Sequence, residues 1–196
     1  MSFRDFTFPD VCDRFGLKLR QARLFDAVEP VQVPPYLKRK IEQGLRLSQG
    51  LYNEKARSEF VVAPLLMEVW SQADERFGLF SGTEMNVDQP RGLNGVCDFL
   101  FARDPLVFVL KAPVLAVVEA KNDNVWNGFG QCVATMYAAH LMNEKDGSID
   151  KVYGASTTGL NWKFFELAGA NLTIDADDYA LPKETEKVSA ILLSLV

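Results

Sequence analysis

The chain has 196 residues, of which 48% are hydrophobic and 24% are charged, a balance typical of one globular domain. No apolar run approaches the roughly 18 residues that cross a membrane, and no basic-then-apolar secretion signal is present, so we expect a cytoplasmic protein without a membrane partner. The net charge of -5 argues against a protein that holds nucleic acid by positive charge alone.

The few cysteine and histidine residues disfavour zinc, redox and Ser-His-Asp chemistry. Cys12, Cys97 and Cys132 are widely spaced and form no Cys-x-x-Cys pair, so we expect small buried hydrophobic side chains. His140 is the only histidine, which disfavours a zinc site built on imidazole ligands and leaves a catalytic triad without a partner motif.

The first 50 residues are predicted to form an N-terminal helical segment that packs on a core domain of residues 51–196. A helix-like piece runs from Asp10 to Arg23, and a second helix is expected from about Tyr36 to Leu51, after two prolines. Residues 1–46 carry a surplus of three positive charges. The basic side chains of the second helix either lie near a phosphate backbone or form a solvated face. They are Lys38, Arg39, Lys40 and Arg46.

A further helix is predicted from about Glu54 to Phe77, where Pro64 indicates a kink or a helix start. Glu59 lies beside the apolar stripe of this helix, which is compatible with either an inward role or a surface position. The turn-rich segment that follows contains a short predicted strand at 83–87, which would form a hairpin with the next strand.

The segment Leu93–Phe101 reads as an apolar strand that one acidic residue, Asp98, interrupts. An aspartate buried there without a partner costs on the order of several kcal/mol, so it must be neutralised, hydrogen-bonded or bound to a cation. A structural aspartate that caps a turn or pairs with an arginine is the alternative to a cation ligand.

The segment Pro113–Asn122 reads as a central strand that ends in two charges, Glu119 and Lys121. Residues two apart on a strand point to the same face, and the carboxyl edge of an open α/β sheet is where ligand crevices lie. The pair is either an ion pair that ends a core strand or part of a hard-metal site. If the two strands are neighbours, Asp98 and Glu119 can reach one Mg²⁺ ion.

The rest of the chain supplies further elements. Residues 106–110 are either a short strand or an excursion before the central strand, and the polar segment 122–129 is a loop at the mouth of the site. A helix is predicted at 130–143, where Gln131 lies in the first turn and Tyr137 is expected in the core. Two strands, 151–157 and 162–167, are predicted to form a hairpin at one sheet edge, and a helix to close the chain over 182–196.

Asp98, about twenty residues and then Glu119-Ala120-Lys121 after an apolar run resemble the core signature of the PD-(D/E)XK, or restriction endonuclease-like, nuclease superfamily. That family often carries a glutamate on the helix before the first core strand, where Glu59 stands, and a glutamine followed by a tyrosine on the helix after the lysine, which Gln131 resembles.

The likeness covers roughly residues 55–170, because the segment 152–167 is similar to the strand, Thr-Gly, Trp, Phe region of restriction-type domains. One departure is that Cys97 stands where the family usually has a proline before the aspartate.

The resemblance implies a three-layer α/β/α fold with a mixed central β-sheet, and a nuclease that uses Mg²⁺ or Mn²⁺ to hydrolyse phosphodiester bonds, with DNA the expected substrate. Asp98 and Glu119, with the carbonyl of Ala120, would hold the metal, and Glu59 would complete a second site or bind through water. Lys121 would position the nucleophile or offset charge in the transition state, and Gln131 would support these groups.

Restriction-type proteins commonly act as dimers or with partner subunits, so the resemblance also implies a homodimer or a partner subunit. Two alternatives remain at this point. One is a catalytically inactive domain of the same fold that serves as a binding or assembly module. The other is a metal-dependent hydrolase that acts on a different substrate, since carboxylates specify a metal better than a substrate.

Overall fold

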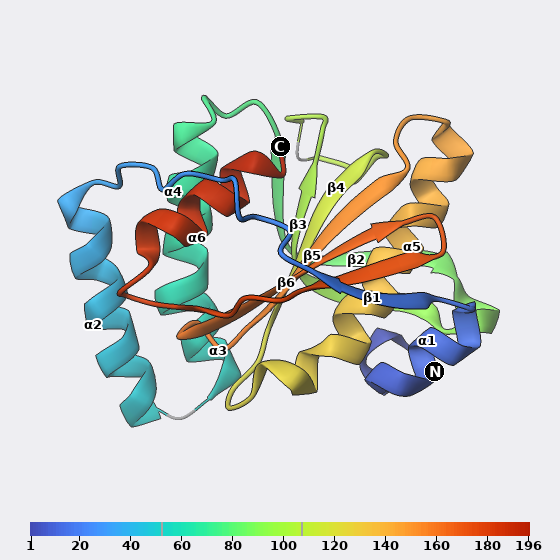
Figure 1. The fold of residues 1–196 in the computed structure, drawn as a ribbon, viewed down its shortest axis with the longest axis horizontal. Coiled ribbons are helices and arrows are strands. Elements are labelled where there is room, and N and C mark those ends of the chain that lie inside the picture. The colour runs from blue at the N-terminus through green and yellow to red at the C-terminus, as the bar shows by residue number, and fades with distance from the viewer. Residues whose placement is uncertain (52, 107) are drawn as a thin grey trace.

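The computed structural model describes residues 1–51, 53–106 and 108–196, which form an eight-stranded mixed sheet with helices on both faces (Figure 1). The strand order is β1-β7-β6-β5-β4-β3-β2, and β8 pairs with β6 beside this path. The strands are β1 Lys18–Ala22, β2 Gly78–Asp88, β3 Leu93–Ala102, β4 Val114–Ala120, β5 Lys151–Thr157, β6 Asn161–Ala168, β7 Asn171–Asp175 and β8 Tyr179–Ala180. The predicted α/β class with a mixed central sheet is confirmed.

The directions of the middle strands determine which strand ends meet at one edge of the sheet. Strands β2, β3 and β4 are antiparallel neighbours, whereas β5 is parallel to β4. A parallel pair requires a crossover, and the chain supplies it through η4 (Val125–Gly128) and α5 (Phe129–Asp146). Both β4 and β5 therefore end at the same edge of the sheet, where the chain enters the η4 segment.

Each face of the sheet has its own apolar core. On one face, α2, η2, α4 and α6 pack against side chains such as Phe101, Val118 and Phe164. On the other face, η1, α1 and α5 pack against side chains such as Val117 and Phe165. The helices not yet bounded are η1 Phe3–Asp5, α1 Phe8–Phe15, α2 Pro35–Leu51, α3 Glu54–Arg57, η2 Ser58–Val62, α4 Ala63–Gln72, η3 Gln89–Arg91 and α6 Thr185–Ser194.

The helical prediction holds in the middle of the chain and is refined at one point. The helix expected at 36–51 is α2, and the helix expected at 54–77 is a run of three segments, α3, η2 and α4. Its middle segment η2 is a π-helix, in which the N–H of Ala63 donates to the carbonyl of Ser58, five residues earlier. The predicted irregularity near Pro64 is thus a π-turn directly before the proline.

The predicted helix from Asp10 to Arg23 is wrong in its second half. Helix α1 ends at Phe15, because Gly16 adopts the left-handed conformation at φ 65° and closes the helix. The chain then forms β1, which pairs in parallel with β7. All five β1 side chains are exposed, so main-chain hydrogen bonds rather than an apolar pattern hold this strand. The first 50 residues therefore contribute a strand to the sheet as well as helices.

Four further predictions meet different outcomes. The strand expected at 83–87 belongs to the longer β2, which pairs with β3 as predicted. The β5–β6 hairpin is confirmed, but β7 and β1 lie beyond it, so it is not at the sheet edge. In the 106–110 segment, the described residues form no strand, which favours the excursion, and Val107 lies outside the described residues. The C-terminal helix is confirmed as α6.

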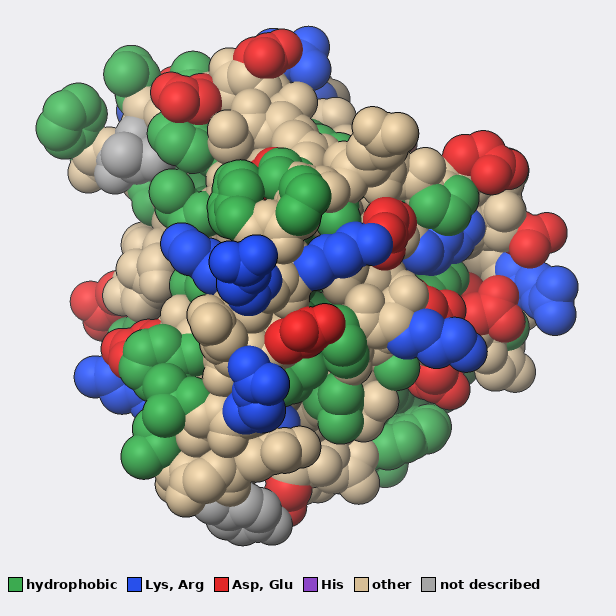
Figure 2. Space-filling view, turned by 90° about the vertical axis from the view of Figure 1, so that its left-hand side faces the viewer, with side chains coloured by type: hydrophobic (Ala, Val, Ile, Leu, Met, Phe, Trp, Pro, Cys, Tyr) green, Lys and Arg blue, Asp and Glu red, His purple; other side chains and the backbone are tan. Residues whose placement is uncertain are grey.

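Figure 2 shows the face of the molecule on which α2 lies, where Lys and Arg side chains are interspersed with Asp and Glu. The basic side chains of α2 are exposed, as predicted, but the mixture of signs favours the solvated face over a continuous phosphate-binding surface. None of the helices in the described parts of the chain is long and apolar enough to cross a membrane.

Candidate metal and phosphate site

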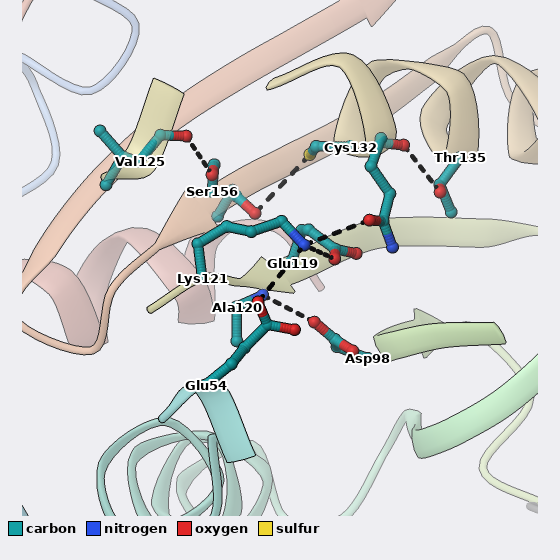
Figure 3. Close-up of polar contacts among 11 residues, drawn as sticks. Glu54, Asp98, Glu119, Ala120, Lys121, Val125, Cys132, Thr135 and Ser156 are labelled. Carbon is teal, nitrogen blue, oxygen red and sulfur yellow. Dashed lines mark hydrogen bonds and ion pairs between the residues drawn. The ribbon is translucent and has the colours of Figure 1, made fainter. Parts of the chain in front are cut away.

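The two acidic strands are direct neighbours, which is the condition under which Asp98 and Glu119 can reach one cation. Strands β3 and β4 pair in antiparallel register, and Asp98 Oδ2 accepts a hydrogen bond of 2.8 Å from the backbone N–H of Ala120 at the end of β4. The carboxylate of Asp98 therefore lies against the last residues of β4, beside Glu119 (Figure 3). Asp98 is half-buried, whereas Glu119 is only 1% exposed.

Glu119, Lys121 and Gln131 form one hydrogen-bonded group. The ammonium of Lys121 donates to Glu119 Oε1 at 2.7 Å and to Gln131 Oε1 at 3.1 Å. The first two side chains meet because alternate residues along an extended chain share a face, and the third reaches them from the first turn of α5. The structure thus brings together three of the residues that the sequence singled out.

The environment of Glu119 disfavours its charged form. Burial raises the pKa of Glu119 well above its ordinary value, and the negative charge of Asp98 raises it further, although Lys121 acts in the opposite direction. For Lys121, burial by itself lowers the pKa, but the charge and hydrogen bond of Glu119, followed by the charge of Glu54, outweigh it and raise the pKa. The lysine therefore carries its positive charge, and the buried carboxylate lacks sufficient positive charge nearby.

Two buried polar atoms in this group have no hydrogen-bond partner: Glu119 Oε2 and Gln131 Nε2. Such atoms cost free energy in an interior, and they need an explanation where they occur together. One is an acceptor and the other a donor, so a ligand that presents a positive charge to the first and an oxygen to the second would satisfy both.

A different glutamate from the predicted one reaches the site. Glu54 Oε2 lies 3.8 Å from Lys121 Nζ, and Figure 3 shows it extending from α3 toward the lysine. Glu59 is 53% exposed and forms its ion pair with Lys55, at 3.6 Å. The structure therefore does not bring Glu59 to the cluster. A signal for Glu54 was present in the sequence, because Asn53 caps α3 by accepting from the Ala56 N–H and so fixes Glu54 at the helix start.

The buried cysteines near the site are structural, as predicted. Burial raises the pKa of Cys97 to about 12, and Cys132 lies on α5 where its thiol donates to the carbonyl of Ala155. A thiol held neutral in this way is a poor nucleophile. All three cysteines are buried and free.

Two other residues considered from the sequence lie elsewhere. His140 is buried and pairs with Glu144 one turn later on α5, with 3.4 Å between His140 Nε2 and a carboxylate oxygen of Glu144. Tyr137 stacks on Phe15 with ring centroids 4.4 Å apart, so it fastens α1 to α5. Among the described residues, neither side chain forms a hydrogen bond, ion pair or ring contact with Glu119, Lys121 or Gln131.

The described residues contain no group of three or more His, Cys, Asp and Glu side chains arranged to hold a metal ion. This arrangement does not fit zinc, which takes three or four protein ligands. It does fit Mg²⁺, which binds through one or two carboxylates and keeps several waters. The unpartnered oxygen of Glu119 beside the carboxylate of Asp98 is the observation that supports this fit.

No model of a known protein family matches the chain, and no curated protein matches it. The nuclease resemblance rests on the residues described above.

Proposed function

We propose that this protein is a Mg²⁺-dependent nuclease of the PD-(D/E)XK superfamily that hydrolyses phosphodiester bonds, with DNA as the expected substrate. The observation that carries the proposal is the convergence of Asp98, Glu119, Lys121 and Gln131 at one sheet edge, with a buried oxygen of Glu119 left unpartnered. A site that stores an unsatisfied carboxylate is where a cation is expected.

The order of the elements supports the restriction endonuclease-like assignment. A glutamate-bearing helix precedes the strands, β3 carries the aspartate, β4 carries the Glu-x-Lys triplet, and α5 carries the glutamine. The signature of the superfamily that the sequence resembles has its parts in this same order. The helices on both faces of the sheet agree with three layers. The exposed Glu59 departs from the expected pattern, and Glu54 takes its place beside Lys121.

Each side chain has a role that its contacts support. Asp98, Glu119 and the carbonyl of Ala120 would hold Mg²⁺, or Mn²⁺ in its place. A divalent cation supplies Lewis acidity, which polarises a phosphoryl oxygen and makes an attacking water more acidic. Lys121 holds a positive charge near Glu119 and so offsets negative charge that develops on the phosphate. Gln131 fixes the ammonium with its oxygen, which leaves its Nε2 to donate to a substrate oxygen.

The test is incubation of the protein with plasmid, linear, single-stranded and branched DNA, and with RNA, in Mg²⁺ or Mn²⁺. We expect cleavage by the wild type and a loss of about 100-fold or more in Lys121→Ala and in Asp98→Asn. The matched control is Lys163→Ala, which removes a buried lysine from the same sheet and should leave cleavage unchanged. Equal cleavage by the wild type and by folded Lys121→Ala would refute the assignment.

A catalytically inactive module of the same fold is the second candidate. It is favoured by the ion pair between Lys121 and Glu119, which partly neutralises the site without a metal, and by the net charge of -5. An inactive module need not bind Mn²⁺, whereas the nuclease must. A homodimer or partner subunit stays a prediction, which light scattering of the purified protein would test.

A further inference from the structure

Trp126 lies on the short helix η4, five residues after Lys121, in the connection that leaves the site. Two contacts fix this helix against the site. Ser156 Oγ, from the β5 residue paired with Glu119, donates to the Val125 carbonyl at 2.6 Å. Gly128 packs so closely that an added Cβ would collide with Ser156 Oγ and lie 3.0 Å from Lys121 Cγ. The backbone that carries Trp126 therefore packs against Lys121 and against Ser156, the strand partner of Glu119.

The side chain of Trp126 is held against Phe129 but remains 59% exposed. The two rings stack with centroids 4.5 Å apart and an interplanar angle of 29°, and Phe129 itself is fully buried in the α5-side core. By contrast, Trp162 is fully buried and Trp70 uses its indole N–H to donate to the Phe77 carbonyl. What distinguishes Trp126 is that its ring is supported on Phe129, leaves much of its surface open to solvent and stands on the segment that leaves the site, an arrangement in which a planar ligand can stack on it.

We propose that Trp126 is a stacking platform for an unpaired base of the substrate, so that the site takes single-stranded or locally unpaired nucleic acid; this inference rests on the proposed nuclease function. In an intact duplex both faces of each base are covered by its neighbours, so an indole can stack only on a base that is unpaired or terminal. Stacking contributes about 1–3 kcal/mol per base. That contribution suits a protein of net charge -5, which cannot rely on phosphate neutralisation for affinity.

The test measures binding of fluorescein-labelled oligothymidylate by anisotropy in Ca²⁺, a cation with a similar preference for oxygen ligands, and competition by relaxed closed-circular duplex DNA, which has no ends or loops. The variants are Trp126→Ala, Trp126→Phe and the control Phe108→Ala. Phe108 is 91% exposed and lies between β3 and β4, at the end of β4 opposite Lys121. We expect Trp126→Ala to weaken single-strand binding about 5- to 150-fold. Trp126→Phe and Phe108→Ala should bind within about threefold of the wild type, because a smaller ring still stacks and the control removes a distant one.

Wild-type single-strand binding that Trp126→Ala leaves unchanged, or an equal loss of affinity for the closed-circular duplex, would overturn the stacking role even if the protein cleaves DNA. Loss of self-association in Trp126→Ala with unchanged oligonucleotide binding would also overturn it, because the exposed ring would then serve a protein contact. Trp126-dependent single-strand binding without cleavage of any substrate would support stacking and refute the nuclease proposal.

Discussion

Two lysines with little exposed surface, the partly buried Lys121 and the buried Lys163, lie in the same part of the sheet and differ in what surrounds them. Ser156 of β5 pairs with Glu119 of β4 on one side and with Lys163 of β6 on the other. Glu119, the partner of Lys121, is therefore two strands away from Lys163. The side chains of the lysines are 14% and 7% exposed. Lys163 donates to the Asp177 carbonyl and pairs with Asp178 at 3.1 Å, and that carboxylate is 76% exposed. Lys121 pairs with a carboxylate that is 1% exposed.

The difference separates a structural ion pair from a candidate functional site. Asp177 and Asp178 border a cavity of about 710 Å³, and the charge of Asp178 is well hydrated. Around Lys121, by contrast, two acidic groups lie together with an unpartnered carboxylate oxygen and an unpartnered amide nitrogen. Burial of unsatisfied charge, rather than the size of a hollow, is therefore what marks the site.

The largest expected difference is in stability when each lysine is replaced by methionine. At about pH 8 and without divalent cations, Lys121→Met should lower the free energy of unfolding by about 3–5 kcal/mol, because it leaves a buried carboxylate unpaired. Lys163→Met should change it by about 1 kcal/mol or less, because Asp178 remains solvated. Urea unfolding of both variants measures this, and equal losses would remove the distinction between the two lysines.

The pH dependence of stability sharpens the same comparison at Glu119. The folded protein holds a proton on this group more tightly than the unfolded chain, whose pKa is near the ordinary value of 4.5. Ionisation of Glu119 therefore costs folding stability as the pH rises above that value. In a chelator, Glu119→Gln should melt at the same temperature as the wild type below about pH 4.5 and at a higher temperature above it. Thermal melts across this range test the sign, and a lower melting temperature for the variant at high pH would contradict it.

The smallest effect distinguishes the two helix glutamates. Glu54→Gln should reduce cleavage by up to about fivefold, because it removes a half-exposed partner of Lys121. Glu59→Gln should leave cleavage within about twofold of the wild type, since its ion pair lies with Lys55. Cleavage rates at matched protein concentration provide the measurement. A larger loss in the Glu59 variant would mean that the sequence had identified the correct glutamate.

The sequence predicted the central site because its signal is local. Asp98 and the pair Glu119 and Lys121 interrupt or end apolar strands, and alternation along an extended chain fixes which side chains share a face. The helix that follows then brings Gln131 over the same edge. The pairing of β3 with β4 meets the condition that the hypothesis set for Asp98 and Glu119.

The sequence could not predict the features that depend on backbone detail. Glu59 lies within the π-helix η2, which adds a residue to one helical turn, so a stripe counted at regular α-helical spacing does not place it. Strand β1 has no apolar alternation, because its position depends on main-chain bonds to β7, which is far away in the sequence. The exposed ring of Trp126 likewise becomes informative only when η4 is seen packed on the site.

The most direct test of the cation site is calorimetric titration of the protein with Mn²⁺. The wild type should bind Mn²⁺, Asp98→Asn should bind it at least about tenfold more weakly, and the exposed-carboxylate control Asp178→Asn should bind it as the wild type does. Absence of Mn²⁺ binding by the wild type, or identical binding by the wild type and Asp98→Asn, would contradict the assignment of Asp98 and Glu119 as metal ligands.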